Sequence, residues 1–93
     1  MKAYTFHEDP GHGWLAVTVA ELYTLGIQGK ISRYSYRSRD GKLAYLEEDC
    51  DLSEFARVKG WSPSDPEVWN QIETVRTNHD SFVRSLPRFE VAA

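Results

Sequence analysis

One stretch decides the fold that the sequence predicts: residues 31–47, which read ISRYSYRSRDGKLAYLE. Tyr34 and Tyr36 lie two positions apart, the spacing of side chains on one face of a strand. Asp40-Gly41 is a hairpin-turn dipeptide, and the residues that follow it again favour a strand. The pattern therefore predicts an antiparallel hairpin with strands at 31–37 and 43–47.

The first residues predict a second hairpin. Residues 3–7 alternate between polar and apolar side chains and place Tyr4 and Phe6 on one face. Residues 8–13 are rich in turn formers, and residues 14–17 favour a strand again. We therefore expect strands at 3–7 and 14–17 to pair with each other.

Three segments carry helix signals and predict helices at 19–25, at 52–59 and from residue 66. Thr18 is followed three residues later by Glu21, which is the spacing of a capping box. Asp49 or Asp51 can cap the second helix, and Pro66 is a favourable first residue for the third.

These elements predict an α+β fold: a small antiparallel sheet of about four strands, in two hairpins, packed with two or three short helices. The 93 residues fit a single domain, 1–93. Residues 61–66, which include two prolines, are expected to be an internal joint, and residues 87–93 a loose C-terminal end. Within residues 71–86 the helical spacing meets a strand-favouring stretch at 74–77, which leaves both structures open.

Large apolar side chains on the inward faces of these elements are expected to form the core. Tyr45 and Leu46 are adjacent, so on a regular strand only one of them can face the covered side of the sheet. Both are included in the predicted core because Leu46 is expected to turn inward at the strand end. The predicted core residues are Tyr4, Phe6, Trp14, Leu22, Leu25, Tyr34, Tyr36, Tyr45, Leu46, Phe55 and Trp69.

Composition excludes several classes of protein. The 11 basic and 14 acidic residues give a net charge of -3, which argues against a general binder of phosphate backbones. No apolar run approaches the roughly 18 residues of a membrane span, and the first residues contain no apolar signal core, so we expect a cytosolic protein. The single cysteine, Cys50, excludes an internal disulfide and a multi-cysteine zinc site, and no cofactor is predicted.

The acidic excess is concentrated in one segment, residues 47–51. Without its four acids, 10 acidic residues would stand against 11 basic ones. Its carboxylates are those of Glu47, Glu48, Asp49 and Asp51. They can form a negative patch that docks a basic protein, cap the following helix, or pair with Arg76 or Arg84. Capping explains Asp49 and Asp51 better than it explains Glu47 and Glu48. Cys50 lies among these charges, which disfavour its thiolate, so we expect a buried or inert thiol.

His7 and His12 bracket the first turn and offer an alternative site. Two imidazoles across a turn can bind a metal, with a carboxylate from Glu8 or Asp9 or with those of 47–51, but this spacing is not one of the strong metal motifs. The simpler interpretation makes His12 a turn residue and places His7 on the solvent face of its strand, with no metal assigned. Arg76 and Arg84 form part of a basic set that can bind an anion or pair with the acidic segment.

Several motifs in this order resemble small phage and prophage proteins. They are DPGHGW at 9–14, LGI at 25–27, ISRYSY at 31–36 and YLEEDCD at 45–51, and the resemblance spans residues 4–58. It implies a phage or prophage setting in bacteria, and it implies neither an activity nor catalytic residues.

The sequence therefore predicts a small interaction protein that docks a basic host or phage protein. Because the acidic patch repels DNA, we expect the partner to be a nucleic-acid-binding protein rather than nucleic acid itself. The alternative is a small metal-dependent or nucleic-acid-processing enzyme that uses His7 and His12 with the 47–51 carboxylates.

Overall fold

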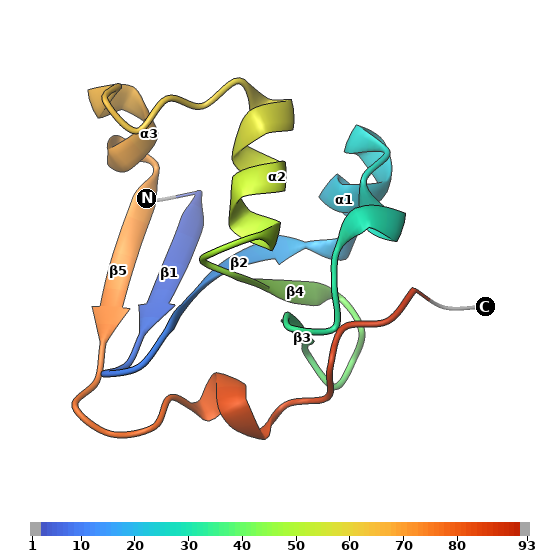
Figure 1. Cartoon of the computed structure of the whole chain (residues 1–93), viewed down its shortest axis with the longest axis vertical. Coiled ribbons are helices and arrows are strands. Elements are labelled where there is room, and N and C mark those ends of the chain that lie inside the picture. Colours follow the sequence, from blue (N-terminus) through green and yellow to red (C-terminus); the bar gives the residue numbers. More distant parts are fainter. Residues whose placement is uncertain (1–2, 92–93) are drawn as a thin grey trace.

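A computed structural model describes residues 3–91, in which one sheet is combined with short helices (Figure 1). The strands are β1 (Tyr4–Glu8), β2 (Gly13–Thr18), β3 (Tyr36–Arg37), β4 (Leu43–Glu47) and β5 (Ile72–Arg76). The α-helices are α1 (Val19–Leu25), α2 (Asp51–Lys59) and α3 (Pro66–Asn70), with 3₁₀ helices at Gln28–Lys30 and Phe82–Ser85. This confirms the α+β class, with five strands in place of the expected four. No helix in the described part of the chain is long and apolar enough to cross a bilayer.

The strands lie in the order β3-β4-β2-β1-β5. β1 and β2 form the expected antiparallel hairpin, with Thr5 opposite Ala16, and β2 also pairs antiparallel with β4. β5 runs parallel to β1, so the sheet is mixed rather than wholly antiparallel. The reason is the long connection: the chain leaves β4, passes through α2 and α3, and then enters the sheet beside β1 in the same direction.

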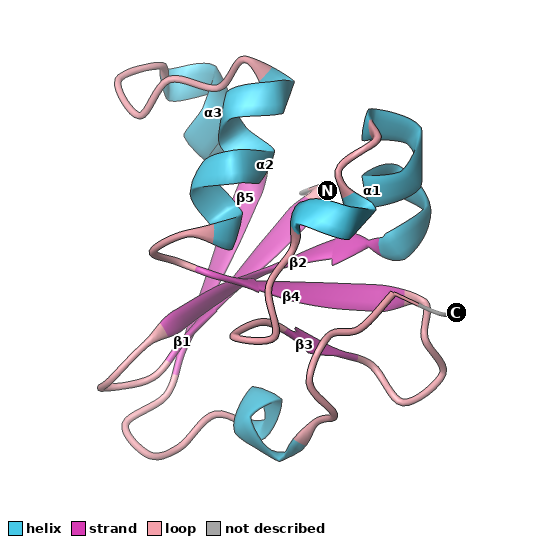
Figure 2. Ribbon diagram, turned by 45° about the vertical axis from the view of Figure 1, so that its right-hand side comes forward, coloured by secondary structure: helices cyan, strands magenta, loops and turns pink. Residues whose placement is uncertain are grey.

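Both faces of the sheet are covered. The three α-helices lie on one face and the chain after β5 crosses the other (Figure 2). Alternation along β4 therefore places Leu46 in the core under the helices and Tyr45 in a second cluster beneath the tail. The second cluster consists of Trp14, Tyr36, Tyr45 and Val83. Tyr45 and Leu46 are both buried because the tail covers the face that was expected to be open.

The strand predicted at 31–37 shrinks to Tyr36–Arg37, which pair with Ala44 and Tyr45. The cause is the carboxylate of Asp51, which takes the place of a backbone acceptor in the sheet. It accepts hydrogen bonds from the N–H and the hydroxyl of Ser32, and the chain bends there. Tyr34 then points outward with 73% of its surface exposed, so its predicted place in the core is wrong.

The predicted helix starts are correct at two of the three helices. Thr18 Oγ1 accepts a hydrogen bond from the N–H of Glu21, and Asp65 caps α3 ahead of Pro66. α3 is only five residues long, and Val68 is the residue that it buries. Trp69 therefore remains 57% exposed, which contradicts its predicted core position.

The C-terminal segment is attached to the sheet. The N–H of Arg37 donates to the carbonyl of Pro87, and the N–H of Phe89 donates to the carbonyl of Ser35. The Phe89 side chain is 3% exposed. The expectation of a loose end at 87–93 is thus wrong for 87–89, and residues 92–93 lie outside the described residues. The expected joint at 61–66 connects α2 to α3, and its Trp61 ring packs edge-on to Tyr4 and Phe55.

Phe55 anchors α2 in the core, with none of its surface exposed. Phe55→Ala should lower the free energy of unfolding by about 3–5 kcal/mol, the usual cost of truncating a buried Phe. Tyr34→Ala is the control and should change it by less than about 0.5 kcal/mol, because Tyr34 is exposed. Denaturant titration measures both, and a loss well under 1 kcal/mol at Phe55 would contradict this packing.

Candidate functional site

The residues selected from the sequence gather at one end of the sheet. β1, β4 and β5 end there and β2 begins there, as the register shows: Glu8 lies opposite both Gly13 and Arg76. Trp14 lies opposite Glu47 in the same region. The first turn, the acidic segment and the start of the tail therefore leave the sheet side by side.

Glu47 binds the start of α2, whose N-cap residue is Cys50. Its carboxylate accepts hydrogen bonds from the backbone N–H groups of Asp49, Cys50 and Asp51. Partial burial alone would raise the pKa of Glu47, but the three donors outweigh it and hold the pKa below its usual value. The sequence predicted Asp49 or Asp51 as the cap of this helix, but the N-cap residue is Cys50, and the Glu47 carboxylate accepts from the N–H groups at the helix start.

Asp51 faces inward and is 3% exposed. Its carboxylate accepts hydrogen bonds from the backbone N–H and hydroxyl of Ser32 and from the hydroxyl of Ser35. The Ser35 hydroxyl in turn accepts a bond from the N–H of Glu47, at 3.0 Å. Asp51 therefore joins the 32–35 loop to the start of α2, and its carboxylate is not accessible to a partner.

Glu48 and Asp49 face outward, and neither forms an ion pair with any residue of the described range 3–91. Partial burial raises the pKa of the Glu48 carboxyl, and the charges of Asp49 and Glu8 raise it further. The four predicted patch residues thus divide into two that hold the turn and two that it presents to solvent.

A hollow of about 420 Å³ lies beside this turn. It is lined by aromatic rings, carboxylates and guanidinium groups, among them Trp14, Tyr34, Tyr36, Glu47, Asp49, Arg84 and Arg88. Arg84 and Arg88 lie over the rings of Trp14 and Tyr36, at 5.2 and 4.5 Å from the ring centres. The hollow therefore carries groups of both charges: the ring of Tyr34 and the carboxylate of Asp49 are of the types that attract a cationic side chain, and the guanidinium of Arg88 repels one.

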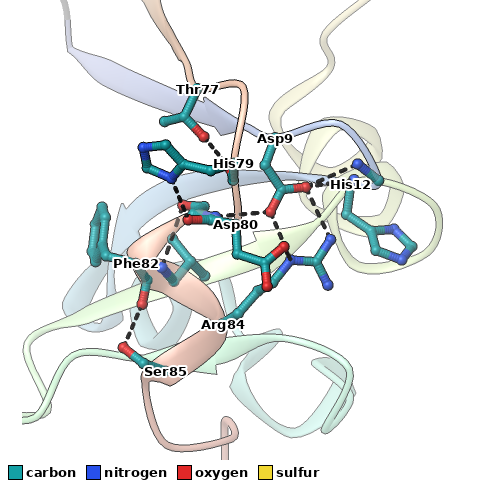
Figure 3. A network of polar contacts seen from close by, with 11 residues as sticks. Asp9, His12, Thr77, His79, Asp80, Phe82, Arg84 and Ser85 are labelled. Carbon is teal, nitrogen blue, oxygen red and sulfur yellow. Dashed lines mark hydrogen bonds and ion pairs between the residues drawn. The ribbon is translucent and has the colours of Figure 1, made fainter.

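Asp9 and Arg84 hold the tail against the first turn (Figure 3). The buried Asp9 carboxylate accepts hydrogen bonds from the N–H groups of Gly11, His12 and Ser81. Arg84 donates to both of its oxygens, at 2.6 and 2.9 Å. The Arg84 guanidinium, together with these backbone donors, keeps the pKa of Asp9 far below its usual value.

The alternative site is only partly assembled. His12 and Arg84 line the same hollow as Glu47, but the ring of His7 packs on Tyr45 and Phe82, with ring centres 5.7 and 5.1 Å apart. His7 lies beneath the tail instead of facing solvent as expected, and burial lowers its pKa. Arg84 pairs with Asp9, as described above.

Arg76, the last residue of β5, pairs with Glu8 at 2.6 Å, and Arg84 pairs with Asp9. Neither arginine is therefore an ion-pair partner of the acidic segment. Within residues 3–91, no group of three or more His, Cys, Asp or Glu side chains is placed to hold a metal ion. Cys50 is exposed, so of the two expected states, a buried or an inert thiol, the first is wrong. The nearby Glu47 carboxylate raises the pKa of its thiol, which confirms that the thiolate is disfavoured.

Comparison with known proteins finds no match from which a function could be assigned. No protein-family model matches the chain, and no curated protein or solved structure matches it either. The function must therefore be argued from the arrangement of side chains at this end of the sheet.

Sequence reasoning considered Asp9 only as a further carboxylate for a metal at His7 and His12, and it missed the polar contacts that Asp9 makes, which are the most numerous at this site. The available signal was Asp9-Pro10-Gly11, because an Asp before such a turn commonly accepts hydrogen bonds from the N–H groups that follow it. The bond to Arg84 had no local signal, since the two residues are 75 positions apart.

Asp9→Asn should lower the free energy of unfolding at neutral pH by about 1–3 kcal/mol, because buried donors lose a charged acceptor. The folded-state pKa of Asp9 lies below that of the unfolded chain, so its contribution is full above about pH 4 and is lost as the pH falls further. Denaturant titrations of both proteins at neutral and acidic pH measure this difference. A difference in the free energy of unfolding between the two proteins that is the same at neutral and at acidic pH would contradict the assigned contacts.

Proposed function

We propose that this protein is a docking domain that binds a basic segment of another protein through Glu48 and Asp49. One observation carries the proposal: these two acids are exposed, adjacent and without an ion-pair partner in residues 3–91. By contrast, Glu8, Asp9, Glu21 and Glu54 all pair with a cation of the same chain.

The turn that carries Glu48 and Asp49 is fixed from both sides. Glu47 holds the N–H groups of Asp49, Cys50 and Asp51, and Asp51 is bound to Ser32 and Ser35. A surface that is ordered before binding loses less conformational entropy when a partner docks. The structure therefore supports a preformed site and not a flexible acidic tail.

Charge supplies the recognition. Partial burial and, after it, the charges of Asp49 and Glu8 raise the pKa of Glu48, and an incoming cation relieves the repulsion between these charges. Beside Asp49, the exposed ring of Tyr34 offers a face for a Lys or Arg side chain. Such a surface speeds association and selects basic partners, and it weakens as salt screens the charges.

The expected setting is the cytosol of a bacterial host, in keeping with the resemblance to phage and prophage proteins. The partner we favour is a basic host or phage protein that itself binds nucleic acid, because the acidic turn repels a phosphate backbone. The enzyme alternative receives less support, since His7 packs under the tail and does not join His12 at the hollow.

The test is a double charge reversal, Glu48→Lys with Asp49→Lys, that leaves intact Glu47, the carboxylate bound to the N–H groups at the start of α2. The matched control is Glu67→Lys with Glu73→Lys, because these acids are also exposed and without an ion pair in the described residues. Both doubles change the net charge equally. The probe is a synthetic peptide in which Lys and Arg alternate with Ser, titrated by calorimetry at low and at high salt.

We expect the wild-type protein and the control to bind the peptide at low salt and to lose affinity at high salt. The Glu48/Asp49 double should bind about tenfold more weakly or worse, which corresponds to about 1.4 kcal/mol. Equal losses in both doubles would mean that only net charge matters, and that result would refute docking at this turn.

A further inference from the structure

A second concave surface, the apolar groove, adjoins the acidic turn. It has a volume of about 410 Å³ and lies between α2, α3 and the strands β1 and β5. Its apolar lining includes Phe6, Leu52, Trp61, Val68, Trp69 and Ile72. Concave sites of this size and polarity are where ligands and anchor side chains usually bind.

The groove is open because α3 is short. Figure 1 shows α3 above the upper end of β5, with the rest of the strand extending below it. α3 has five residues, which is little more than one helical turn. Ile72 and Thr74 both line the groove from β5, but Ile72 is partly buried whereas Thr74 is exposed. Val75, the next residue, does not line the groove and lies on the opposite face of the strand.

Trp69 gives the groove a preformed aromatic wall. Its side chain is 57% exposed, yet its indole N–H donates to the carbonyl of Pro63 at 2.8 Å, which fixes the orientation of the ring. An exposed tryptophan held in one position is typical of residues that contribute strongly to protein interfaces.

Glu48 connects the groove to the acidic turn, since it belongs to the turn and also lines the groove. The other charged groups of the groove are Glu8 and Arg76, which neutralise each other at 2.6 Å. Glu48 is therefore the groove carboxylate that has no ion-pair partner in residues 3–91. A ligand that fits must bring an apolar group for the groove and a cation for its edge.

We propose that the apolar groove receives an apolar side chain of the same partner segment whose Lys or Arg meets Glu48. This inference rests on the proposed function and makes the partner more specific: a segment in which a Leu or aromatic residue lies next to basic residues. A second copy of this chain is the competing occupant of the groove.

The experiment compares two peptides. The first is the basic peptide described above, and the second differs from it by one Ser→Leu change between basic residues. Thr74→Trp fills the groove from β5, and Val75→Trp is the matched control, which adds the same ring to the opposite face of the same strand. Trp69→Ala is a second groove variant, for use if Thr74→Trp does not fold.

We expect the Leu peptide to bind the wild-type protein and Val75→Trp about tenfold more tightly than the basic peptide. This gain should disappear in Thr74→Trp and in Trp69→Ala, while their binding of the basic peptide remains unchanged. The Glu48/Asp49 double reversal should weaken both peptides, so a failure of acidic docking is distinguished from a failure at the groove.

Two results would overturn the inference. One is that the Ser→Leu change does not raise the affinity of the peptide for the wild-type protein, or raises it equally for the wild-type protein and for Thr74→Trp. This holds whatever the affinity of the basic peptide is. The other is a wild-type dimer in sedimentation analysis that Thr74→Trp dissociates and Val75→Trp does not, because the groove would then be an interface between two copies.

Discussion

The buried carboxylate of Asp9 is the constraint on which much of the structure depends. It binds the N–H groups of its own turn, and with Ser81 and Arg84 it holds the chain that follows β5. That chain covers the second face of the sheet, where Trp14, Tyr36 and Tyr45 would otherwise meet water, and it contributes Val83 to their cluster. A sheet of this size with one open face would bury far less apolar surface, and a short chain depends strongly on each buried ring.

The acidic segment shows how identical side chains acquire different functions from their positions. Glu47 and Asp51 both end in carboxylates that the backbone and two serines occupy, whereas Glu48 and Asp49 carry the same group into solvent. The two structural acids fix the turn, and the two exposed acids are available for a partner. Capping and docking are therefore compatible properties of one turn and not competing explanations of its charge.

The sequence predicted those features that short-range chemistry determines. The β1–β2 hairpin, the Thr18 cap and the start of α3 at Pro66 all follow from residues close to one another in the chain. The errors came from distant contacts: Asp51 bends the segment around Tyr34, and the tail buries the second sheet face. The acidic segment of the candidate site was foreseen from composition. The hollow and the apolar groove were not, because they exist only where the tail and α3 meet strands far away in the sequence.

The most direct test of this account is a nuclear magnetic resonance titration of the isotope-labelled protein with the Leu-containing basic peptide. The account predicts the largest shift changes at the amides of Glu48 and Asp49, accompanied by the indole N–H of Trp69, which lines the groove. The amides of the 38–42 turn, at the opposite edge of the sheet from β5, should stay unchanged. Shift changes centred on that far edge, or spread evenly over the molecule, would contradict the account.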